Sequence, residues 1–151
     1  MIVFETPADM AAAVGRDLGV SDWHAIDQAT IDAFAAATGD RQWIHVDVAR
    51  AKAELPGGTT IAHGYLLLSL LPVLAAGIWR IEKRSRSLNY GLNKLRFTSP
   101  VPVGARVRLK QKIVAAEATG GGWRIVMENV LEIDGESRPA LVAETISLSS
   151  A

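Results

Sequence analysis

The segment Gly64–Trp79, GYLLLSLLPVLAAGIW, is the stretch of this chain that decides its fold. It is apolar on all sides, yet it is shorter than the roughly 20 residues of a membrane-spanning helix, and Ser69, Pro72 and Gly77 interrupt it. A helix of this kind is buried in the middle of a soluble domain. We therefore expect a central helix from about His63 to Trp79, kinked at Pro72, and no membrane association.

Beyond this segment the periodicity of apolar residues changes from that of a helix to that of a strand. Four stretches rich in Val, Ile and Leu are separated by glycine- and proline-rich turns at hairpin spacing. The pattern predicts an antiparallel meander with one face wrapped around the apolar helix, which is an α+β fold. The predicted strands cover Asn89–Phe97, Arg106–Glu117, Trp123–Asp134 and Arg138–Ser149.

Capping signals predict shorter elements before the apolar segment. A helix begins at Thr6-Pro7 and runs to about Gly15, and Ser21–Ile26 has the loose alternation of an edge strand. Asp27 is the expected N-cap of a helix that Gly39 ends, because apolar residues between them recur at i, i+3, i+4 and i+7. Asp47 caps a further helix that runs to about Glu54.

Composition limits the classes of protein to which the chain can belong. A length of 151 residues predicts one domain over residues 1–151, and 49% hydrophobic residues exclude a disordered chain. Because 16 Lys and Arg balance 16 Asp and Glu, no overall field attracts nucleic acid or an anionic membrane. The absence of cysteine excludes disulfides and thiolate chemistry. The first ten residues lack the features of a secretory signal, so a cytoplasmic location is expected.

The segment Gly39–His45, GDRQWIH, places a carboxylate and an imidazole five positions apart, just after a predicted helix. Hydration of a double bond conjugated to a thioester needs a base for water, a proton for the α-carbon and donors for the enolate oxygen. Asp40 and His45 can carry out both proton transfers if one water lies between them. The same spacing is also compatible with a capping aspartate and a packed, hydrogen-bonded histidine.

His63-Gly64, at the start of the apolar helix, is the second candidate element. A glycine there lets a substrate oxygen approach the N–H groups of the first turn, although close packing of the helix start explains it equally well. His63 itself is better interpreted as structural than as catalytic. Asp40, His45, Asp47 and His63 could bind a metal ion, but their spacing matches none of the zinc signatures, so no metal is expected.

Other chemistries have weaker support in the sequence. Ser69 lies in an apolar helix without a G-x-S-x-G turn, so a serine hydrolase is not expected, and no glycine motif suits a bound phosphate. A group of basic residues is typical of a solvated face, although some of its members could bind the phosphates of a nucleotide-bearing thiol. No aromatic residues alternate with them in the manner of a nucleic-acid site. The group consists of Lys83, Arg84, Arg86, Lys94 and Arg96.

Three stretches of the chain together resemble one family. GDRQWIH (39–45) resembles the hydratase-2 motif, G-D-x-N-P-hydrophobic-H, of the MaoC-like dehydratases, the (R)-specific enoyl-CoA hydratases. TTIAHGYLLLSLLP (59–72) is similar to the entry into that family's central helix. KLRFTSPVPVGARVRL (94–109) is similar to its strand–turn–strand stretch. Within the family, the segments ATGDRQWIHVD, TIAHG and NYGLNK most resemble the nodulation-protein-N-like branch.

This resemblance implies a hot-dog fold, in which a curved antiparallel sheet wraps a long central helix, and a homodimer with its active site near the interface. It implies that Asp40 and His45 are the catalytic pair on a shared water and that the Gly64 amide holds the thioester carbonyl. The implied reaction is reversible syn hydration of trans-2-enoyl-CoA to (R)-3-hydroxyacyl-CoA, without metal or redox cofactor, as in fatty acid metabolism. Candidate substrate-binding residues are Gln42, Trp43, His63, Tyr65, Lys94 and Arg96.

The chain departs from the motif at two positions. Gln42 stands where the family has Asn, and Trp43 stands where it has Pro, so an amide contact can shift and the acyl tunnel can be reshaped. Two alternatives therefore remain beside the hydratase. The same fold supports a thioesterase, in which a carboxylate-activated water attacks the carbonyl carbon, and it supports an acyl-thioester-binding module without catalysis.

Overall fold

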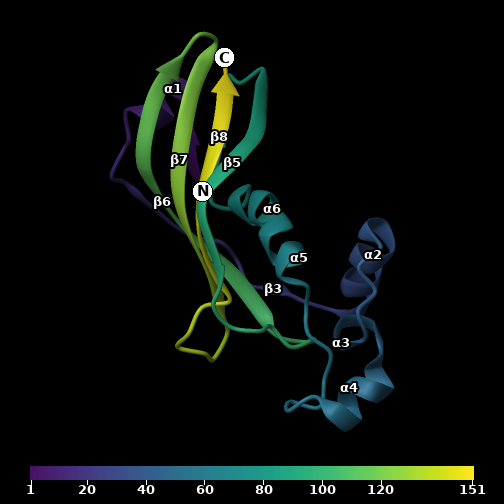
Figure 1. Ribbon diagram of the computed structural model, residues 1–151. Helices are drawn as coiled ribbons and strands as arrows, with labels where there is room; N and C mark the ends of the chain where they lie inside the picture. The colour runs from purple at the N-terminus through teal and green to yellow at the C-terminus, as the bar shows by residue number, and fades with distance from the viewer.

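A six-stranded antiparallel sheet, with two short apolar helices against one face, forms the centre of the computed structural model, which describes residues 1–151 (Figure 1). The strand order is β2-β6-β7-β8-β5, and β3 also pairs with β6. This arrangement confirms the predicted α+β class. The strands are β2 (Asp17–Val20), β3 (His24–Ala25), β5 (Arg86–Phe97), β6 (Arg106–Thr119), β7 (Gly122–Ile133) and β8 (Leu141–Ser150).

The predicted meander is correct for β6, β7 and β8 but wrong for β5. β5 pairs with β8 along ten registered positions and has no contact with β6 in the sheet. The reason lies in the connection 98–105, which contains Pro100 and Pro102 and does not fold back as a tight turn. Its backbone instead bonds to the loop before the central helices, where Ala62 donates to Val101 O and Val103 donates to Thr60 O.

The predicted central helix is two helices, α5 (Gly64–Ser69) and α6 (Leu71–Ala75). Pro72 lies in the first turn of α6, where its missing N–H interrupts the helical ladder, so the expected kink appears as an interruption at the single residue Leu70. The predicted extension to Trp79 is wrong, because Trp79 begins β4 (Trp79–Ile81). β4 pairs in parallel with β1 (Ile2–Phe4) as a separate two-stranded sheet. None of the helices is long and apolar enough to cross a membrane.

The capping predictions before the central helices hold. Asp27 caps α2 (Gln28–Thr38) through the Thr30 amide, and Gly39 ends this helix with a φ of 82°, which favours glycine. Asp47 caps α4 (Val48–Glu54) in the same manner. The structure adds α3 (Trp43–Val46), a single turn that the sequence did not indicate, and it reduces the predicted edge strand to β3. The first helix, α1 (Pro7–Ala11), has the predicted cap but ends before Gly15.

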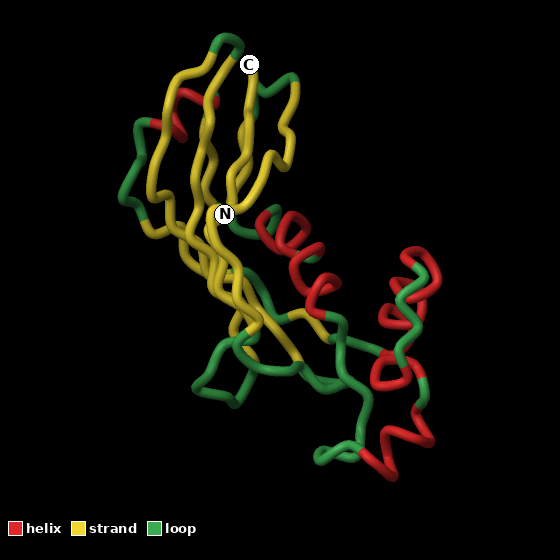
Figure 2. Tube along the Cα trace, in the orientation of Figure 1, coloured by secondary structure: helices red, strands yellow, loops and turns green.

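Helices α2, α3 and α4 form a helical arm, residues 28–54, that stands apart from the sheet beside α5 (Figures 1 and 2). These helices contact one another more than they contact any strand. The sheet body, which we define as the six-stranded sheet with α5 and α6, holds most of the hydrophobic core. From the arm, Ile31 of α2 enters this core. The largest fully buried apolar side chains of the sheet are Val107, Leu109, Ile113, Ile125, Leu131 and Leu141.

Candidate active site

Asp40 lies in the loop that follows α2, and its backbone is fixed at two points. Its amide donates to Thr38 Oγ1 over 3.3 Å, and its carbonyl oxygen is 2.9 Å from His63 Nε2. The left-handed Gly39 directs the chain out of the helix immediately before it. The carboxylate itself is exposed, and its contact within the protein is a long one, 3.4 Å from Oδ1 to the Gln42 amide nitrogen. Asp40 is therefore a carboxylate on an anchored loop, free to bind a small polar molecule.

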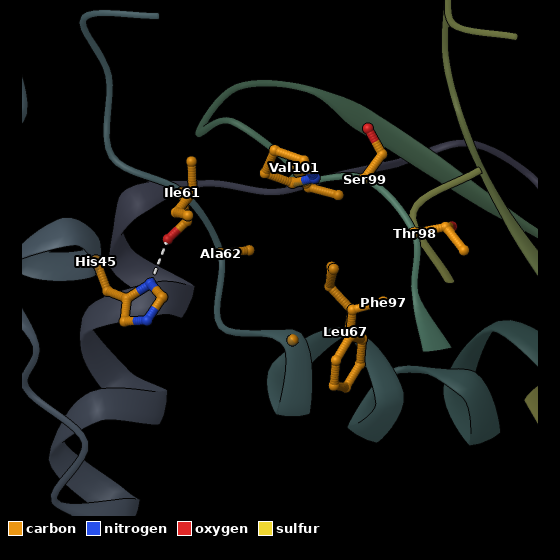
Figure 3. A pocket seen from close by; sticks show the side chains of 10 residues that line it. His45, Ile61, Ala62, Leu67, Phe97, Thr98, Ser99 and Val101 are labelled. Carbon is orange, nitrogen blue, oxygen red and sulfur yellow. Dashed lines mark hydrogen bonds between the residues drawn. The ribbon is translucent and has the colours of Figure 1, made fainter. Parts of the chain in front are cut away.

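His45 is buried in α3, and its hydrogen bond fixes its tautomer. Its Nδ1 is 2.7 Å from the carbonyl oxygen of Ile61 (Figure 3). Because a carbonyl only accepts, Nδ1 carries the proton of the neutral ring, and Nε2 carries a lone pair. His45 also lines a pocket in the protein. The ring is therefore prepared to accept a proton from a molecule bound there.

The environment of His45 favours the neutral ring. Burial lowers the pKa of His45 below its ordinary value of about 6.5, and the neighbouring His63 acts in the same direction. The hydrogen bond to Ile61 and the charge of Asp40 raise this pKa, but the effect of burial is larger. At neutral pH the imidazole is therefore uncharged, which is the state that a general base requires.

The backbone of His45 is held by a second set of side chains. Gln28, at the start of α2, donates from Nε2 to the His45 carbonyl oxygen over 2.8 Å. The amide oxygen of Gln28 accepts from the Thr60 hydroxyl over 2.5 Å. These bonds connect α2, α3 and the loop before α5 into one unit. Neither Gln28 nor Thr60 was predicted from the sequence, because the polar pairing spans 32 residues.

A pocket of about 280 Å³ opens between the start of α5 and the segment that follows β5 (Figure 3). His45 forms one side of it, and Gly64 lies at the helix start. Most of the other lining is apolar, as expected of a site for a hydrocarbon chain. The remaining lining residues are Ile61, Ala62, Leu67, Phe97, Thr98, Ser99, Pro100 and Val101.

Gly64 allows a close approach between α5 and β5. A Cβ atom at this position would lie 2.9 Å from the ring of Phe97, so any side chain would force the ring or the helix to move. Gly64 is also the first residue of α5, where the amides of the first turn have no partner within the helix. No side chain caps this helix start. A backbone donor therefore lies at the pocket beside His45.

Asp40, His45 and His63 form one cluster, in which one polar atom of each lies within 4.8 Å of the others. A single water can bridge atoms at this separation. The cluster suits a metal ion less well. The rings of His45 and His63 are stacked at 3.8 Å with planes 24° apart, and a metal must lie near the plane of each imidazole that binds it. The planes of two stacked rings do not meet near the ring nitrogens, so one metal ion cannot lie in both planes.

Family membership follows from the sequence as a whole. Residues 9–132 match the family described as MaoC like domain. The chain belongs to the MaoC-like domain family. This result confirms the resemblance of the three stretches noted in the sequence.

Relatives of this MaoC-like chain are similar over nearly its whole length. It is 48% identical over 147 residues to 3-hydroxyacyl-thioester dehydratase Z of Mycobacterium tuberculosis (strain ATCC 25618 / H37Rv), with 97% of each chain covered. It is 44% identical to nodulation protein N of Rhizobium leguminosarum bv. viciae, with 93% of this chain and 89% of that protein covered. The second match supports the predicted nodulation-protein-N-like branch.

A solved structure extends the similarity to the fold. The (R)-hydratase from A. caviae involved in PHA biosynthesis superposes with a TM-score of 0.71 at 25% identity, over 89% of this chain and 95% of that one. The MaoC-like chain thus has the hot-dog fold of the (R)-hydratases, as predicted. Together with the sequence relatives, this similarity identifies the protein as an enzyme, a dehydratase of the hydro-lyase class.

The structure places the predicted substrate-binding residues of the MaoC-like chain in different surroundings. Trp43 does not line the pocket, because its ring lies under the Arg50 guanidinium at 4.0 Å. Gln42 and His63 are also outside the lining, and His63 lies behind His45. Tyr65 is exposed, with its ring edge against the lining residue Phe97 at 5.8 Å.

The two basic candidates lie on β5 before Phe97. Lys94 and Arg96 are exposed, and they precede the lining residue Phe97 in this strand. Lys94 Nζ is 3.9 Å from Glu144, and Arg96 donates to the carbonyl oxygen of its neighbour Leu95. Neither side chain is therefore committed to a strong buried pair.

Several lining residues were not singled out from the sequence. Ile61 orients His45 through its backbone oxygen, which no residue pattern reveals. Phe97 and the segment 98–101 line the pocket, although the sequence indicated only the end of a strand and a turn there. Their signal was the similarity of KLRFTSPVPVGARVRL to the family stretch, which marked the segment without assigning it a role.

Proposed function

We propose that the protein catalyses the reversible hydration of trans-2-enoyl-CoA to (R)-3-hydroxyacyl-CoA. The observation that carries this proposal is the free Nε2 of a neutral His45, in one cluster with the Asp40 carboxylate and in one pocket with Gly64. The names of the relatives support the substrate class, since they include a 3-hydroxyacyl-thioester dehydratase and an (R)-hydratase.

In this mechanism Asp40 and His45 hold one water between them. The water oxygen bonds to the β-carbon of the enoyl thioester while one of its protons passes to a member of the pair. The double-bond electrons move to the thioester oxygen as an enolate. The α-carbon then takes one proton from the pair, which returns to its starting state. Every proton lost by water is thus accounted for, and no redox cofactor is needed.

Gly64 provides the donor for the developing enolate. Gly64 is the first residue of α5 and lines the pocket, which supports its amide as the donor to the thioester oxygen. The absence of a side chain on Gly64 leaves this approach open, since Phe97 already fills the other side. The apolar lining, which includes Leu67 and Val101, then excludes water from the acyl chain.

The carrier end of the substrate lies outside this pocket in our proposal. Lys94 and Arg96 are the nearest exposed basic residues along β5, and phosphate groups attract such pairs. Substitution of both by Gln should raise KM for the CoA thioester at low salt with little change in kcat, because these contacts do not change during the reaction. An equal loss in kcat would contradict this assignment.

We also propose that the active form is a homodimer built on β5. This strand has one neighbour, β8, so its other edge carries unpaired backbone groups. It exposes apolar side chains, and Phe97 continues this surface onto α5 through Tyr65. Such a long apolar edge is suited to a second copy, which would present the same surface by two-fold symmetry. The exposed apolar residues of β5 are Leu88, Tyr90, Leu92 and Phe97.

The dimer is tested by light scattering at micromolar concentration. Leu92→Lys places a charge on the proposed interface and should shift the protein to monomer. Val20→Lys is the matched control, because Val20 is similarly exposed on β2, at the opposite edge of the sheet. A wild-type protein that scatters as a monomer, or equal dissociation of both variants, would contradict the β5 interface.

The reaction is tested by following the enoyl absorbance of crotonyl-CoA with a thiol reagent in parallel. Loss of absorbance without thiol release, abolished in Asp40→Asn, is the expected result. Release of free thiol would assign the protein to the thioesterases. Binding of enoyl-CoA without turnover, with short and long chains alike, would identify a binding module and overturn the proposal.

A further inference from the structure

His63 touches both members of the proposed catalytic pair without reaching the pocket. Its Nε2 bonds to the Asp40 carbonyl oxygen at 2.9 Å, and its ring stacks on that of His45 at 3.8 Å. Phe34 of α2 packs against it at 4.9 Å. The residue is 2% exposed and does not line the pocket. Its position favours a role behind the pair over direct contact with substrate, which is the role that the sequence suggested for it.

The single side-chain hydrogen bond of His63 goes to the loop that carries Asp40. A carbonyl oxygen only accepts, so Nε2 carries the proton of this ring. Its other nitrogen, Nδ1, is buried and has no partner. A buried polar atom without a partner costs free energy. Full hydrogen bonding of the ring therefore does not explain a histidine at this position. The bond to Asp40 is the polar contact that it provides.

We propose that His63 is a positioning residue, whose Nε2–H holds the Asp40 loop one water away from His45. This inference rests on the proposed function and assigns a role to a residue within it. The Asp40 side chain has one long contact of its own, so its place depends on its backbone. A displacement of about 1 Å in such a pair is enough to lower a rate about 100-fold.

Two substitutions separate the hydrogen bond from the ring. His63→Gln keeps an N–H donor at nearly the reach of Nε2 but removes the stacked ring. His63→Phe keeps a ring between Phe34 and His45 but removes the donor. His24→Gln, on β3 outside the site, is the control for removal of a histidine. Each variant is assayed with crotonyl-CoA, beside Asp40→Asn, and its thermal midpoint is recorded.

The expected result is that His63→Phe lowers kcat about 100-fold, while KM changes less than about threefold. His63→Gln should recover kcat to within about tenfold of the wild type, because it restores the donor. A residue that served only packing would show the reverse order, with Gln worse than Phe. Equal kcat in the two variants, or losses that follow the thermal midpoints, would overturn the inference.

Hydrogen exchange of the peptide 39–43 tests the same contact without turnover. We expect faster exchange in His63→Phe and wild-type exchange in His63→Gln, measured well below the thermal midpoints. If the wild type does not hydrate crotonyl-CoA, the proposed function fails, and exchange still decides whether His63 holds the loop. If the wild type is active and depends on Asp40, but His63→Phe is fully active, the inference alone fails.

Discussion

The helical arm and the sheet body contribute to one site but are held together in different ways. In the sheet body, β6, β7 and β8 each bond to strands on both sides and bury side chains such as Leu109 and Leu131 completely. The arm contributes Ile31 to this core, packs Phe34 against it, and otherwise contacts mainly itself. Asp40 and His45 belong to the arm, whereas Gly64 and the pocket wall belong to the body or to the segments beside it.

This difference suggests that the stability of the protein and its proton chemistry are largely separable. Besides the apolar contacts of Ile31 and Phe34, the arm meets the body through a few polar contacts around the loop before α5. These are the bonds of His45 to Ile61, of Gln28 to Thr60 and of Asp40 to His63. The Ile61 amide also donates to Ile44 O. Substitutions in the sheet body should therefore mainly lower the free energy of unfolding, and substitutions in the helical arm should mainly lower the hydration rate.

The largest expected effect is on the arm. Asp40→Asn should lower the hydration rate roughly 10²- to 10⁴-fold, because it removes a proton carrier. The free energy of unfolding should change little, since the carboxylate is exposed. Steady-state assays and urea unfolding measure the two quantities. Asp22→Asn, also exposed but outside the site, is the control, and near-normal activity of Asp40→Asn would remove Asp40 from the mechanism.

A substitution in the body should give the opposite result. Leu131→Ala empties a fully buried position of β7 and should lower the free energy of unfolding by about 2–5 kcal/mol. Its kcat per folded molecule should stay near the wild-type value at low temperature. Chemical unfolding and active-site titration provide the comparison. A large loss of kcat in the folded protein would show that the two regions are more tightly coupled than their contacts indicate.

Gly64→Ala acts where the arm and the body meet, and a smaller effect is expected. The new Cβ would lie 2.9 Å from the Phe97 ring, and the resulting overpacking should cost about 1–3 kcal/mol. Displacement of Phe97 should also raise KM for the enoyl thioester. Thermal unfolding and KM measure these effects. Gly121→Ala, between β6 and β7, where a Cβ would meet nothing within 4 Å, is the control.

The smallest expected effect is a pH dependence from His45. Because burial lowers its pKa in the folded state, the unfolded chain binds more protons below about pH 6.5. Its contribution to stability is therefore complete above that pH and is lost as the pH falls through the folded-state pKa. The acid limb of kcat/KM should likewise have its midpoint below about 6.5. A midpoint above this value would contradict the buried, neutral base.

The sequence predicted those parts of the fold that local chemistry determines. The caps of α2, Asp27 and Gly39, and the cap Asp47 of α4 act within a few residues, so their side chains alone indicate them. The hairpins β6–β7 and β7–β8 likewise follow from their turns. The pairing of β5 with β8 was missed because it depends on where the connection 98–105 finds its hydrogen-bond partners.

The candidate site shows the same limit. The motif indicated Asp40 and His45 and, further along, His63 and Gly64, which the structure brings into one region. The motif could not indicate that a backbone oxygen of Ile61 would fix the tautomer of His45, because every residue has such an oxygen. Trp43 was expected to reshape the acyl tunnel, but its ring is stacked under Arg50. The presence of a bulky residue in a motif does not indicate in which direction its side chain points.

The opposite tautomers of the two buried imidazoles make the site its own spectroscopic probe. The protein has three histidines, and His45 carries its proton on Nδ1 while His63 carries its proton on Nε2. A protonated and an unprotonated ring nitrogen resonate at different ¹⁵N frequencies. The Nδ1 and Nε2 frequencies of His45 should therefore be exchanged in His63, and His24 is the reference outside the cluster. Isotope labelling of histidine alone would therefore show, in one spectrum without substrate, the protonation state of each imidazole.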